Sequence, residues 1–235
     1  MARRPLLARR GLAVVIVIGA VLVTAAIGVR YAHTRTPGRI DEHLDAAIQR
    51  RVADHPHLVV HVVDLADPGS IIVICAVLCA LFLLLNRTRL AVLAVLGPGL
   101  AGGLVDLVLK PLFDRHIATS LSFPSGHTAA TASLALVVIC AMVGPGRLQW
   151  PVGLRWVIAV AATAAVPIIA IALVGGGYHY ATDTIGGLLV AIACVLSVAL
   201  VIDAIAGQPE DYRAAHKATW DDGAQPADAR PRVRA

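Results

Sequence analysis

Residues 124–143 read PSGHTAATASLALVVICAMV. The polar motif Pro124-Ser125-Gly126-His127 therefore runs directly into an apolar stretch with the length of a helix. A second polar motif, His179-Tyr180-Ala181-Thr182-Asp183, stands directly before another apolar run. Since apolar runs of this length suit a bilayer, the sequence predicts that both motifs lie at the edge of a membrane.

The composition indicates an integral membrane protein. Of the 235 residues, 58% are hydrophobic and only 15% are charged, a balance that soluble domains rarely show. A membrane-spanning helix needs roughly 20 apolar residues. The chain contains six such runs and is predicted to be an all-α, polytopic membrane protein. The runs are Leu12–Val29, Gly69–Leu85, Leu90–Leu109, Thr128–Val143, Leu154–Val174 and Thr182–Ile205.

The first run has an alternative interpretation as a cleaved signal peptide. Arg3, Arg4, Arg9 and Arg10 precede it, and small residues follow at 24–26. Five further runs would keep the protein in the membrane in either case.

The distribution of basic residues predicts the orientation. With six spans both termini share one side, and that side carries most of the Lys and Arg residues, so the termini are predicted to be cytoplasmic. The net charge of +5 is spread over tails and short loops, which argues against a nucleic-acid partner. We expect a multi-pass protein of the cell (plasma) membrane, and the sequence leaves its oligomeric state open.

Two segments outside the runs complete the predicted organisation. Within residues 39–67, Ile40, Leu44, Ile48 and Val52 recur every four positions, which predicts a surface amphipathic helix. Residues 1–205 would then form one membrane domain, and the polar residues 206–235 a disordered cytoplasmic tail.

The first motif has the features of an anion site. Ser125, Gly126 and His127 open a predicted helix, where unpaired N–H groups and the helix dipole favour a negative charge. Gly126 permits close approach of a ligand to the backbone, and the Ser125 hydroxyl can donate to a phosphate oxygen.

The second motif and the preceding loop supply a nucleophile and cations. His179 and Asp183 are four residues apart, so a helix would place them on one face, where the carboxylate fixes the tautomer of the ring. Lys110 and Arg115 add positive charge on the same side of the membrane. Asp106 stands one turn before Lys110, which is consistent with a carboxylate that orients Lys110 and equally with a simple ion pair inside the span.

Together these residues resemble the type 2 phosphatidic acid phosphatase family, whose signature is K-x6-R-P, P-S-G-H and S-R-x5-H-x3-D. The resemblance extends from about Ile40 to Ile205 and implies a six-span, haloperoxidase-like helical core. It implies a metal-independent hydrolase without cofactor, with His179 as nucleophile, Asp183 as its partner and His127 as general acid. Phosphate would be held by Lys110, Arg115, Ser125 and Gly126.

The chain departs from the signature at two places. The first motif's Arg and Pro positions hold Ile117 and Ala118, and the third motif's Ser and Arg positions hold Ala172 and Leu173. Arg115 is the nearest substitute for the first arginine. Since a charge-assisted hydrogen bond contributes about 1.5–3 kcal/mol, losing one lowers transition-state stabilisation.

Three functions compete at this stage. The first is a phosphatase that hydrolyses a lipid phosphate or diphosphate through a phosphohistidine on the extracytoplasmic face. Polyprenyl diphosphate, phosphatidic acid and phosphatidylglycerol phosphate are the substrates that the resemblance implies. The second is a catalytically weak relative that binds or transports lipid phosphates. The third, vanadate-dependent haloperoxidation, fits poorly with six spans.

Overall fold

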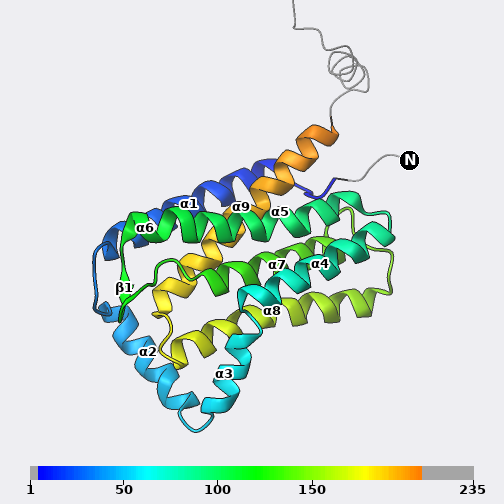
Figure 1. The fold of residues 1–235 in the computed structure, drawn as a ribbon. Coiled ribbons are helices and arrows are strands. Elements are labelled where there is room, and N and C mark those ends of the chain that lie inside the picture. The colour runs from blue at the N-terminus through cyan, green and yellow to red at the C-terminus, as the bar shows by residue number, and fades with distance from the viewer. Residues whose placement is uncertain (1–4, 208–235) are drawn as a thin grey trace, which may run out of the picture.

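The computed structural model describes residues 5–207 as a bundle of long helices (Figure 1). Two short strands interrupt the helices near one end of the bundle. In chain order the elements are α1 (Arg10–Tyr31), α2 (Arg39–Val52), α3 (Pro56–Asp64), α4 (Pro68–Leu84), α5 (Thr88–Leu104), the π-helical turn η1 (Val105–Leu109), α6 (Lys110–Phe113), β1 (His116–Ile117), β2 (Ser120–Leu121), α7 (Gly126–Val143), α8 (Val152–Gly175) and α9 (Ala181–Ala206).

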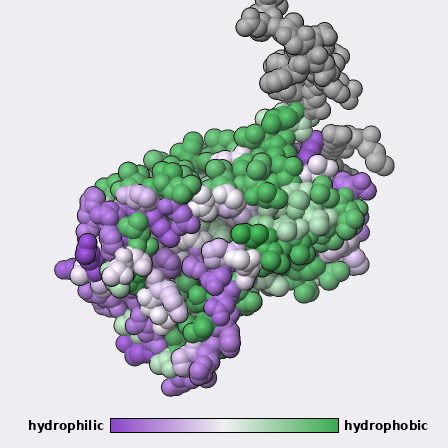
Figure 2. Space-filling model, viewed as in Figure 1, coloured by the Kyte–Doolittle hydropathy of each residue, from purple (hydrophilic) through white to green (hydrophobic). Residues whose placement is uncertain are grey.

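The membrane architecture predicted from the apolar runs is confirmed. Five helical segments are long and apolar enough to cross a bilayer: α1, the continuous stretch from α5 to α6, α7, α8 and α9. A sixth span arises if α3 and α4, which meet at a 49° bend, are counted together. The surface is apolar along these helices and hydrophilic around α2 and the loops (Figure 2), as a bilayer requires of its lipid-facing segments.

Short-range signals set several helix ends. Pro56 and Pro68 begin α3 and α4, where proline lacks only an N–H that would be unpaired in any case. The Ser125 hydroxyl caps α7 by accepting the Thr128 N–H. Prolines 98 and 167 lie inside α5 and α8.

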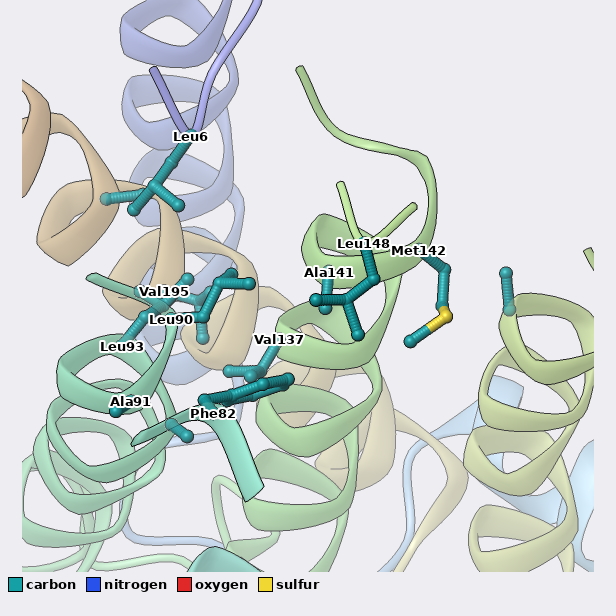
Figure 3. Close-up of a cluster of buried hydrophobic side chains, with 13 residues drawn as sticks. Leu6, Phe82, Leu90, Ala91, Leu93, Val137, Ala141, Met142, Leu148 and Val195 are labelled. Atoms are coloured by element: carbon teal, nitrogen blue, oxygen red, sulfur yellow. The ribbon is translucent and has the colours of Figure 1, made fainter. Parts of the chain in front are cut away.

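The core of the bundle lies between α5, α7 and α9. Leu93, Val137 and Val195 are fully buried there, and Phe82 of α4 covers them (Figure 3). Leu6 packs on the same cluster, where its N–H and that of Leu7 donate to the buried Asp203 carboxylate near the end of α9. The start of α1 and the end of α9 therefore meet at one end of the bundle, opposite α2 and the start of α9 (Figure 1).

The segment 39–67 differs from the single surface helix that was expected. It forms two helices, α2 and α3, separated at residues 53–55. Ile40 and Leu44 are exposed on α2, whereas Asp41 and Asp45 are buried against the bundle. The polar face of α2 is turned inward because it binds groups at the start of α9, described below. The tail expected at 206–235 lies almost wholly outside the described residues.

Helices α7 and α9 touch backbone to backbone at the end that carries both polar motifs. The Ser125 N–H donates to the Asp183 carbonyl oxygen at 2.9 Å. Gly187 of α9 faces the start of α7, and a Cβ there would collide with the Ser125 carbonyl oxygen and lie 3.1 Å from the Ala129 nitrogen. Only glycine permits this approach, because the obstructing atoms belong to the backbone of α7.

We therefore expect Gly187→Ala to lower the free energy of unfolding by about 1–3 kcal/mol, because the added methyl group must push the two helices apart. Thermal unfolding of the purified protein in detergent measures the change. Gly19→Ala in α1 is the matched control, since its Cβ would meet no atom within 4 Å. Equal unfolding midpoints for the two variants would contradict the proposed contact.

Candidate active site

The two histidines of the motifs lie next to each other at the polar end of the bundle. The His127 and His179 ring centroids are 6.2 Å apart, and the ring planes are inclined by 65°. His127 is the second residue of α7, and His179 precedes the N-terminus of α9, so the contact between these helices brings the rings together. A tetrahedral phosphorus could lie between two rings at this separation.

Asp183 contacts both His179 and the backbone at the start of α9. Its Oδ2 lies 3.6 Å from His179 Nδ1, and it also accepts the Tyr180 N–H at the start of α9. The His179 Nδ1 atom is buried and lacks a hydrogen-bond partner at this distance. Catalytic hydrogen bonds are often long in ligand-free sites and shorten when substrate binds. Because Nδ1 faces Asp183, Nε2 is the nitrogen left for a substrate.

Lys110, the first residue of α6, has its side chain near the start of α7. Its Nζ is 2.8 Å from Asp106 Oδ1, and a Cβ added to Gly126 would be 3.8 Å from the same nitrogen. The pair belongs to the π-helical turn η1 and the residue after it. Such turns are rare and often occur at functional sites.

Ser125 and Gly126 form the beginning of α7 as expected. The Ser125 side chain is fully buried and its oxygen accepts from the Thr128 N–H and hydroxyl groups. Gly126 is the first helical residue, so its N–H has no acceptor within the helix. These two residues therefore supply an anion-binding helix terminus, with the serine mainly fixing its geometry.

Arg115 does not line the cavity, although the sequence predicted that it would help to hold phosphate. It is fully buried, with Nη1 2.6 Å from Asp183 Oδ1 and Nη2 2.7 Å from Asp41 Oδ2. Its guanidinium also lies over the Tyr31 and Tyr180 rings, 4.3 and 4.5 Å from their centroids. The terminal nitrogens are thus engaged by carboxylates, so Arg115 supports Asp183 from behind instead of facing the cavity.

The two signature-arginine positions hold apolar residues, Ile117 and Leu173. Leu173 is fully buried in a cluster with Val59 and Val63 of α3. Ile117 belongs to the β1–β2 hairpin, which begins directly after Arg115. No guanidinium replaces these two within residues 5–207, because Arg115 is held in the ion pairs just described.

Sequence reasoning missed three carboxylates around the site. Asp41 and Asp45 of α2 accept the backbone N–H groups of Thr182 and Ala181 at the start of α9. Asp67, between α3 and α4, has Oδ1 3.3 Å from His127 Nε2. The four-residue spacing of Asp41 and Asp45 is a signal for one helix face, whereas nothing in the local sequence marks Asp67 as a partner of His127.

An apolar cavity of about 570 Å³ opens from the polar groups between α4, α5 and α7. Asp106, Lys110, Gly126 and His127 form its polar end. The remaining wall is mainly apolar and includes Ile71, Val95 and Pro98. A second apolar cavity, of about 910 Å³, lies between α4, α7 and α8. Among residues 5–207, no group of three or more His, Cys, Asp or Glu side chains is arranged to hold a metal ion.

Comparisons with known proteins agree with this geometry. Residues 106–205 match the family model described as the PAP2 superfamily, and this segment contains both histidines, Lys110 and Asp183. Among solved structures, the fold matches a transmembrane PAP2-type phosphatidylglycerolphosphate phosphatase from Bacillus subtilis. The TM-score is 0.60 at 20% sequence identity, over 79% of this chain and 93% of the other. Comparison with curated protein sequences gives no match.

Removal of Arg115 is expected to destabilise the fold strongly. Arg115→Met leaves Asp41 and Asp183 buried without their cation, and breaking such a pair typically costs about 3–5 kcal/mol. Chemical or thermal unfolding in detergent measures the loss. Arg35→Met, on the exposed loop after α1, is the control and should change stability by less than about 0.5 kcal/mol. A small effect of Arg115→Met would show that its ion pairs contribute little.

Asp45 makes the stability of this end of the bundle depend on pH. Burial raises the pKa of Asp45 to about 6, although its hydrogen bond from the Ala181 N–H opposes the rise. The folded state then binds more protons than the unfolded state, so this contribution to stability falls as the pH rises through about 6. We expect the wild type to lose stability relative to Asp45→Asn between pH 5 and 7.5. If the unfolding midpoints of the wild type and Asp45→Asn changed with pH in the same way, this prediction would be contradicted.

Proposed function

We propose that this chain, whose residues 106–205 match the PAP2 superfamily model, is a membrane phosphatase that hydrolyses a lipid phosphate or diphosphate. One observation carries the proposal. The His127 and His179 rings lie 6.2 Å apart, and His127 and Lys110 form part of the polar end of an apolar cavity. The fold shared with a membrane phosphatidylglycerolphosphate phosphatase supports the same class of substrate, a phosphorylated lipid.

In the proposed first step His179 Nε2 attacks phosphorus. Asp183 stabilises the positive charge that develops on the ring, and Arg115 holds Asp183 in place. As the N–P bond forms, the bond from phosphorus to the leaving oxygen breaks, and His127 gives that oxygen a proton. The product of this step is a phosphohistidine at His179 and a free lipid alcohol or lipid phosphate.

In the second step water replaces His179 on phosphorus. His127, now neutral, takes a proton from the attacking water, the N–P bond breaks, and inorganic phosphate leaves. Lys110 and the Gly126 N–H stabilise the phosphoryl oxygens during both steps, and Ser125 fixes the helix terminus that presents this N–H. All of these groups belong to the chain itself, so the proposed reaction needs no metal ion or cofactor.

The substrate would reach the site from the bilayer. The cavity between α4 and α5 is apolar away from its polar end, so a lipid tail can lie there while the phosphate contacts the start of α7. The site lies at the end of the bundle opposite the start of α1. Together with the excess of basic residues on the terminal side, this favours cytoplasmic termini and an extracytoplasmic site in the cell membrane.

A second candidate function is favoured by one observation. The cavity lacks the two signature arginines, and Arg115 does not replace them. The chain could therefore bind lipid phosphates with little turnover. In that case phosphorylated lipids would bind and shift the unfolding temperature, while no phosphohistidine would accumulate.

Phosphate release from lipids in the absence of metal ions tests the proposed phosphatase activity. With a chelator present, the purified protein should release phosphate from phosphatidic acid or phosphatidylglycerol phosphate in micelles. His179→Ala should lower kcat by at least about a thousandfold, because the nucleophile is lost. His57→Ala, an exposed histidine of α3, is the control. A phosphohistidine trapped in alkaline denaturant should appear in the wild type only. Unchanged turnover in His179→Ala would overturn the mechanism.

A further inference from the structure

Lys110 and His127, at the mouth of the cavity, each contact a carboxylate. Lys110 Nζ contacts Asp106 Oδ1 at 2.8 Å, and His127 Nε2 contacts Asp67 Oδ1 at 3.3 Å. The Asp67 and Asp106 side chains are 53% and 59% exposed. Their negative charge therefore acts on an entering ligand as well as on the neighbouring cation.

The buried charged groups next to His179 also affect the net charge around the site. Arg115 is shared between Asp41 and Asp183, and Asp45 lies on the same face of α2. This buried group holds more carboxylates than cations, so it contributes no net positive charge toward the site. Of the residues that line the cavity, Lys110 is the one with a permanent positive charge.

The amount of negative charge on a substrate should thus decide how well it is used. A phosphate monoester carries a charge of about −1.5 to −2 at pH 7. A diphosphate has a second phosphate and therefore at least one further negative charge. The terminal phosphate would be held at His127 and Lys110, which places the additional charge close to Asp67 or Asp106.

We propose that Asp67 and Asp106 are specificity-determining residues that make the site prefer a lipid phosphate monoester to a lipid diphosphate. The inference rests on the phosphatase function proposed above and narrows its substrate class. Like charges at the mouth repel the diphosphate without any steric obstruction. The same carboxylates keep Lys110 and His127 in place, which a monoester still requires.

Two substrates that share the same lipid tail and differ only in the number of phosphates test the proposal. A polyprenyl monophosphate and the corresponding diphosphate are supplied separately to the full chain in mixed micelles at low ionic strength. Initial phosphate release gives kcat/KM for each. We expect the monophosphate to be preferred by about tenfold or more, and high salt to narrow the gap because exposed charges are screened.

Two variants assign the preference to the carboxylates. Asp67→Asn and Asp106→Asn should each raise the ratio of diphosphate to monophosphate turnover several-fold, whatever their effect on the absolute rates. Asp64→Asn is the matched control, because it removes an exposed carboxylate from α3 three residues before Asp67 and should leave the ratio unchanged.

The possible results separate the two proposals. Equal or faster wild-type turnover of the diphosphate would overturn the specificity inference and leave the phosphatase intact. Ratios unaffected by both asparagine variants would show that the preference has another origin and would also overturn it. No phosphate release from either polyprenyl lipid, nor from phosphatidic acid or phosphatidylglycerol phosphate, would overturn the phosphatase function on which the inference rests.

Discussion

The ion pairs of Arg115 with Asp41 and Asp183 hold together the end of this bundle that carries the candidate site. Arg115 lies on the loop after α6, Asp41 on α2 and Asp183 on α9, so one guanidinium joins three segments that are distant in sequence. Taking these charges out of water is costly, and close geometry with both carboxylates offsets the cost. The Tyr31 and Tyr180 rings enclose the cation and add the terminal residue of α1 to the same group.

This arrangement explains why a signature arginine can be absent while the histidines remain in place. Asp183 must stay oriented toward His179, and Arg115 holds its carboxylate from the buried side. The position of Leu173 is then available for packing α3 against α8. In the proposed mechanism a guanidinium would serve two tasks. Arg115 keeps Asp183 oriented toward His179, whereas direct charge compensation of the phosphate is reduced.

The sequence predicted what depends on local pattern and failed where partners are remote. The spans follow from the length of the apolar runs, and the meeting of His127 with His179 follows from two motifs at helix starts on one side of the membrane. The role of Arg115 could not be predicted, because its partner Asp41 lies 74 residues away. The spacing of the apolar residues of α2 predicted its helical period correctly. The face that is buried, however, is the polar one that carries Asp41 and Asp45.

Helix α4 borders two apolar cavities, one shared with α5 and α7 and the other with α7 and α8. Cavities lined by residues such as Ile71 and Leu78 forfeit dispersion contacts unless something fills them. In a bilayer, lipid acyl chains that entered these cavities would complete the packing around α4. The stability of the fold would then depend on the thickness and saturation of the membrane.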